Sequence, residues 1–128
     1  MIDLEPSPTS GILRLDPCHS RLFSWIEWNP KALELRDESS GRLIQPAGPS
    51  LTVRYRTTGA EWTAWPVSEE EARAIMQPGP LYDFSSGRAY SQIILPRKSK
   101  RMVKPGERQE TVRQREQAEN KAGRRWLA

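Results

Sequence analysis

Two arginines and two tryptophans in the middle of the chain are suited to contact with a nucleic acid. Arg54 and Arg56 lie in the stretch LTVRYRT at residues 51–57, and Trp62 and Trp65 follow at 62–65. Bases stack on aromatic rings and guanidinium groups hold phosphates, so a sheet face bearing all four side chains would bind a single strand. We favour the other interpretation, that the rings fill the core or a protein interface, because aromatic residues dominate the energetics of both.

The C-terminal segment is a second candidate for contact with a partner. Residues 97–128 hold eleven Lys and Arg against four Glu, a net charge of +7, whereas residues 1–96 carry a net charge of −3. This asymmetry predicts an anionic partner, either RNA or DNA or an acidic protein surface, although a solvated tail would have the same composition. The contact residues expected there are Arg97, Lys98, Lys100, Arg101, Lys104, Arg124, Arg125 and Trp126.

No group of residues predicts catalysis or metal binding. Cys18 and His19 are neighbours, and neighbours in sequence rarely present a nucleophile and a base to one substrate. The acids at 69–71 are explained by the start of a helix. The chain has neither a glycine-rich phosphate loop nor a nucleophile elbow, and one Cys with one His is too few for a zinc site. We therefore expect a protein that is not an enzyme and has no metal or cofactor.

Short strands must position the candidate residues. Residues 11–16, 21–28 and 62–65 have strand composition, and residues 51–57 alternate apolar and polar side chains, which is typical of a strand with one wet face. The stretch 21–28 is apolar on both faces, so another layer or another chain is expected to cover it.

Four further elements complete the prediction. Residues 31–38 favour a strand over a short helix, with residues 42–45 returning as its hairpin partner, and residues 89–95 are predicted to be the last strand. The one helix that we predict spans residues 68–76, where Ser68 and Glu71 form a capping box.

The predicted fold is therefore α+β: a small antiparallel sheet with one short capped helix and an extended or helical basic C-terminal tail. Residues 1–10 form an N-terminal arm, residues 11–96 the body, and residues 97–128 the tail. We expect the tail to become helical only when a partner supports it, because an isolated helix of this length is marginal.

A family resemblance covers about half of the chain. The pattern consists of SGI at 10–12, LTVRY at 51–55, Gly59, Trp62, Trp65, Val67 and SGRAYSQII at 86–94. It is similar to the KTSC domain, which is found at the C-terminus of some lysyl-tRNA synthetases and alone in small bacterial and phage proteins. Ala64, Ser68 and Ser91 depart from that pattern. The resemblance implies a KTSC-like body with an insertion at residues 17–50, and RNA binding has been suggested for the family.

The function expected from these observations is a non-enzymatic structural module for protein–protein interaction. It would pack into a larger assembly, such as a phage virion or another multi-subunit complex, with its tail docked on a neighbour. The alternative is an RNA- or DNA-binding protein that uses the tail and the sheet aromatics. The N-terminal residues do not resemble a signal peptide and no stretch is apolar enough to span a membrane, so we expect a cytoplasmic or virion-associated protein that is not secreted and has no membrane partner.

Overall fold

A computed structural model describes residues 4–8, 10–79, 85–96 and 99–103. The elements are β1 (Leu13–Leu15), β2 (Phe23–Ala32), β3 (Leu35–Arg36), β4 (Leu43–Gln45), β5 (Gly48–Tyr55), β6 (Glu61–Trp65), α1 (Glu69–Met76), α2 (Ser86–Ile93) and β7 (Ser99–Met102). Five strands form one antiparallel sheet in the order β1-β2-β5-β6-β7, and β3 pairs with β4. The prediction of an α+β fold with a small antiparallel sheet is confirmed.

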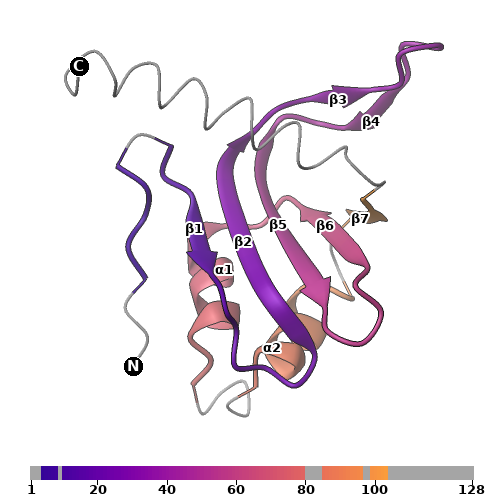
Figure 1. The fold of residues 1–128 in the computed structure, drawn as a ribbon. Coiled ribbons are helices and arrows are strands. Elements are labelled where there is room, and N and C mark those ends of the chain that lie inside the picture. The colour runs from indigo at the N-terminus through magenta and orange to yellow at the C-terminus, as the bar shows by residue number, and fades with distance from the viewer. Residues whose placement is uncertain (1–3, 9, 80–84, 97–98, 104–128) are drawn as a thin grey trace, which may run out of the picture.

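Both helices lie on the same side of the five-stranded sheet, behind it in the view of Figure 1. The core between the two layers is formed by apolar side chains of the sheet (Leu13, Ile26, Leu51, Val53, Ala64), of α1 (Ala72, Ile75, Met76) and of α2 (Ala89, Tyr90, Ile93). At one end of the core, the Phe23 ring meets Tyr55 and Tyr90 edge to face, with ring centroids 5.2 and 5.3 Å apart. These contacts fix the ends of β2 and β5 to α2.

Helix α1 begins where the sequence predicts it. The Ser68 hydroxyl accepts a hydrogen bond from the Glu71 backbone N–H at 3.1 Å, and the Glu71 carboxylate accepts one from the Ser68 N–H at 3.2 Å. This reciprocal pair satisfies two of the backbone donors that a helix start leaves open. The predicted capping box is confirmed.

The prediction of a strand at residues 89–95 is wrong, because these residues belong largely to a second helix, α2. The Ser85 hydroxyl caps it by accepting a hydrogen bond from the Arg88 N–H at 3.3 Å. Ala89, Tyr90 and Ile93 are all buried, and their spacing places them on one helical face toward the core. The β-branched composition suggested a strand, but the burial of this face favours a helix.

The sheet continues beyond residue 96, where the sequence suggested that the body ends. Strand β7 pairs with β6 through Trp62↔Met102 and Trp65↔Ser99, so the basic segment begins as an edge strand. The rest of the predicted tail, with its proposed helix, lies outside the described residues. The same holds for Arg97, Lys98, Lys104, Arg124, Arg125 and Trp126.

Strands β2 and β5 are longer than the other strands of the five-stranded sheet. Their paired ends extend past these neighbours and continue into a projecting hairpin. Beyond Ala32↔Gly48, β3 and β4 extend the ribbon, as Figure 1 shows at the upper right. The predicted pairing of residues 31–38 with 42–45 is therefore confirmed in its central part. We call residues 33–45 the hairpin arm.

Candidate functional site

The two tryptophans of the predicted stacking surface lie on opposite faces of β6. Trp62 is level with Val53 and Ile26 in the sheet register and packs against the core, partly buried. Trp65 is three residues further along, and an odd spacing in a strand reverses the face. One nucleic-acid strand could not stack on both rings, so the structure does not assemble this part of the predicted site.

The two arginines of the predicted site also have separate roles. Arg54 is exposed, and its guanidinium lies near Gly59 in the turn between β5 and β6. The Arg56 guanidinium donates to the carbonyls of Cys18 (2.6 Å) and Ser20 (3.2 Å) in the loop before β2 and to that of Phe23 (2.9 Å), the first residue of β2. Arg56 therefore anchors this loop, and its donors are not directed toward a ligand.

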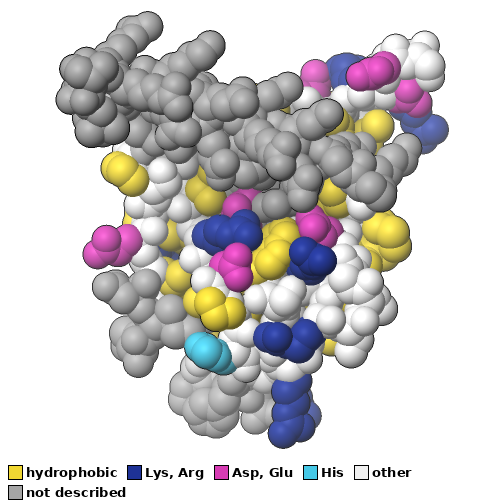
Figure 2. All heavy atoms as spheres, viewed as in Figure 1, with side chains coloured by type: hydrophobic (Ala, Val, Ile, Leu, Met, Phe, Trp, Pro, Cys, Tyr) yellow, Lys and Arg dark blue, Asp and Glu magenta, His cyan; other side chains and the backbone are white. Residues whose placement is uncertain are grey.

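The sheet face away from the helices is polar and carries both signs of charge. Its central row crosses all five strands in register and consists of Arg14, Glu27, Thr52, Thr63 and Arg101. Arg14 donates to Glu27 at 2.7 Å, and the two threonine hydroxyls are 2.8 Å apart. Figure 2 looks onto this face and shows basic, acidic and apolar side chains next to one another among the described residues.

Arg14 organises one end of this polar face. Its guanidinium also bonds Asp16 at 2.9 Å and lies 4.7 Å from the centre of the Trp25 ring. Burial alone would lower the pKa of Arg14, but the hydrogen bonds to Glu27 and Asp16 outweigh this and raise it. The Arg14 charge is thus engaged by two carboxylates and a ring, which leaves it poorly placed for a phosphate.

Strand β2 is covered on both faces, as its apolar composition required. Toward the helices, the Trp28 indole is buried and its Nε1–H donates to the Val67 carbonyl at 2.7 Å. On the polar face, Trp25 is buried and stacks with Arg14. Neither ring presents an open stacking surface.

The two described basic residues of the C-terminal cluster lie on the edge strand β7. Lys100 is level with Ala64 and Arg101 with Thr63, so their side chains are on opposite faces of the sheet. Lys100 is exposed and Arg101 is partly buried. The strand thus presents its charge on both sides of one sheet edge.

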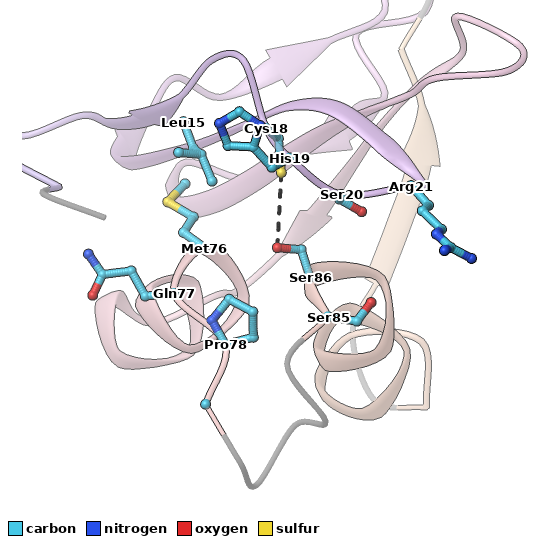
Figure 3. A pocket seen from close by; sticks show the side chains of 11 residues that line it. Leu15, Cys18, His19, Ser20, Arg21, Met76, Gln77, Pro78, Ser85 and Ser86 are labelled. Atoms are coloured by element: carbon cyan, nitrogen blue, oxygen red, sulfur yellow. Dashed lines mark hydrogen bonds between the residues drawn. The ribbon is translucent and has the colours of Figure 1, made fainter. Parts of the chain in front are cut away.

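A pocket of about 660 Å³ lies between the loop before β2 and the two helices. Figure 3 shows the Cys18 sulfur directed toward the Ser86 hydroxyl, to which the thiol donates over 4.0 Å, while His19 is exposed. The pocket is also lined by Met76 and Pro78. Among the described residues, the hydrogen-bond partner of the buried Cys18 thiol is therefore the Ser86 hydroxyl and not the adjacent His19 imidazole.

Sequence reasoning missed one exposed apolar feature, the hairpin arm. Leu33 is 49% exposed and Leu43 is 43% exposed, one on each side of the hairpin. The sequence does contain a sign of this, since Leu33 and Leu43 lie among charged and turn residues, where a side chain destined for the core is unusual. These neighbouring residues do not predict the long pairing of β2 with β5, which makes the arm project away from the core.

Among the described residues, no helix has both the length and the apolar character needed to cross a membrane. In the same part of the chain, no three Cys, His, Asp or Glu side chains gather in a way that could hold a metal ion. Comparison of the chain with family models, with curated proteins and with solved structures finds no match in any of the three.

Proposed function

We propose that this chain is a non-enzymatic interaction module that packs into a larger protein assembly. The observation that carries the proposal is the hairpin arm, which holds two exposed leucines away from the core. Leu33 and Leu43 both lie on this one projection, and exposed apolar surface on a projection favours a protein contact. The similarity to KTSC domains makes a phage virion or another multi-subunit complex the setting that we expect.

Backbone hydrogen bonds within the hairpin arm close its tip. Its tip closes through hydrogen bonds from Asp37 N–H to the Arg42 carbonyl (2.9 Å) and from Gly41 N–H to the Asp37 carbonyl (2.8 Å). Gly41 has a φ of 70°, which a glycine adopts without strain. Because a two-stranded hairpin is marginal by itself, burial of its leucines by a partner would stabilise it.

The charges around the arm favour a protein partner over a nucleic acid. Residues 31–45 contain three basic side chains (Lys31, Arg36, Arg42) and three acidic ones (Glu34, Asp37, Glu38). Arg36 is already bonded to Glu34 at 2.9 Å. A balanced polar rim around apolar residues is typical of protein interfaces, whereas phosphate binding requires an excess of positive charge.

The proposal is tested by recovering partners of the full-length tagged chain from cells of the organism that encodes it. The double variant Leu33→Ser, Leu43→Ser should lower the recovery of specific partners about tenfold, because truncating a central apolar contact commonly costs that much affinity. Leu95→Ser is the matched control, since Leu95 is also exposed but lies just after α2. Equal recovery with all three proteins would contradict the proposal.

Nuclease treatment in the same experiment distinguishes protein interaction from the alternative function, RNA or DNA binding. If the chain binds RNA or DNA through its basic C-terminal segment, the recovered proteins should be released by nuclease and should be insensitive to the arm variant. Recovery that resists nuclease and depends on the leucines would support the protein-interaction module.

A further inference from the structure

The outer edge of β7 is the one strongly charged sheet edge among the described elements. Residues 97–104 read RKSKRMVK, with five basic residues and no acid, and β7 occupies the middle of this stretch. The sheet order places no described strand beyond β7. In contrast, β1 at the other edge is only three residues long and is followed by Asp16 and Pro17.

The register of β7 shows which of its backbone groups face outward. The Val103 N–H donates to the Glu61 carbonyl at 2.9 Å, so Val103 is directed toward β6. Backbone groups alternate in direction along an antiparallel strand, and therefore Arg101 and Ser99 also turn toward β6. The N–H and C=O groups of Lys100 and Met102 consequently turn away from the sheet, and the Met102 carbonyl also accepts a hydrogen bond from the Arg101 guanidinium at 3.3 Å.

The side chains at these outward positions are accessible. Met102 is 54% exposed, and Lys100 is exposed as well. An edge strand with outward backbone donors and acceptors can accept an extended peptide as an additional strand, with main-chain hydrogen bonds supplying affinity and side chains supplying selectivity.

The positive charge of β7 determines which kind of peptide strand could pair with its outer edge. A second copy paired in an antiparallel fashion would bring basic residues opposite basic residues, which is unfavourable across strands. Opposite charges in the same positions are favourable. We infer that the edge of β7 binds an acidic, extended segment of a partner protein by strand addition. This inference rests on the proposed function, but it concerns a different surface from the hairpin arm.

The test uses the full-length protein and a fluorescent peptide of ~8 residues that alternates glutamate and valine, a usual strand length. Binding is followed by fluorescence anisotropy at low and moderate salt. A peptide that alternates lysine and valine is the charge control and should bind at least about tenfold more weakly, since like charges oppose pairing. Lys100→Glu should narrow or reverse this preference.

Two perturbations separate strand addition from simple charge attraction. Met102→Pro removes an outward N–H and leaves the bonds to β6 in place, so it should weaken binding about tenfold, whereas Met102→Ala should not. The second perturbation leaves the protein unchanged: N-methylation of alternate peptide residues on the edge facing β7 should weaken binding to a similar degree. Equal thermal unfolding midpoints for the two Met102 variants verify the fold.

The inference is overturned if the acidic peptide does not bind, or if it binds with an affinity that neither Met102→Pro nor N-methylation alters. An oligouridine probe distinguishes the remaining source of negative charge. Binding of that probe without binding of the peptide would make β7 a phosphate contact and would also overturn strand addition. None of these outcomes depends on Leu33 or Leu43, so failure here is distinguishable from failure of the proposed function.

Discussion

Replacement of Trp28 by Phe should be among the most damaging conservative changes in the sheet. The Trp28 indole is buried, and its Nε1–H donates to the Val67 carbonyl at 2.7 Å, where the chain passes from β6 to α1. Phe keeps most of the apolar ring but removes the donor and leaves the carbonyl buried without it, which costs about 1–3 kcal/mol. The smaller ring adds about 1 kcal/mol for lost packing. The expected loss in unfolding free energy is therefore about 2–4 kcal/mol.

Urea denaturation followed by far-ultraviolet circular dichroism measures this loss, with the slope of free energy against urea expected to stay constant. At ~4 °C per kcal/mol, the thermal midpoint should fall by about 8–16 °C. Trp62→Phe is the matched control, because Trp62 packs at the edge of the core and bonds no described residue through its indole. Its loss should stay below about 1 kcal/mol. Equal losses for the two variants would refute the role given to the Trp28–Val67 bond.

Two further predictions concern stability. Arg56→Lys should lower the unfolding free energy in urea denaturation by about 1 kcal/mol, because an ammonium cannot reproduce the planar guanidinium that reaches the carbonyls of Cys18, Ser20 and Phe23. Arg54→Lys should cost nothing measurable, and equal losses for the two variants would argue against the anchoring role of Arg56. Burial, with a smaller contribution from Tyr55, raises the pKa of Tyr90 above its ordinary value of about 10. As the pH rises, the Tyr90 hydroxyl therefore loses its proton at a lower pH in the unfolded chain than in the folded one. The unfolding free energy should be constant below pH ~10 and should fall above it, by up to about 1.4 kcal/mol per pH unit. Tyr90→Phe should flatten that fall, and an unchanged slope would show that Tyr90 does not cause it.

The elements that the sequence predicts correctly are those with a local physical cause. The capping box at Ser68 and Glu71 needs only four neighbouring residues, and it appears where expected. Helix α2 also has a local pattern, with Ala89, Tyr90 and Ile93 at helical spacing, but isoleucine and tyrosine also favour strands. Packing of the helical face against the core favours the helix over the strand, and this packing depends on residues far away in the sequence.

The candidate site was harder to predict because it depends on register. Trp62 and Trp65 are close in sequence, yet the two-residue period of a strand places them on opposite faces. Strand β7 has the polar sequence SKRM and forms only because β6 offers it an edge. The exposed leucines of the hairpin arm likewise depend on how far β2 and β5 extend beyond their neighbours.

The position of β7 in the chain affects how the protein is made. Strands β1 to β6 can pair in the order in which they are synthesised, but β7 follows both helices. At a synthesis rate of roughly 5–20 residues per second, the outer edge of β6 stays unpaired for a few seconds until β7 has been made. An uncovered edge next to Trp62 and Trp65 is a template for pairing with another nascent chain. A chain that ended at residue 96 would lack β7 and would leave the outer edge of β6 unpaired. We therefore expect such a truncated chain to associate with other copies more readily than the full chain.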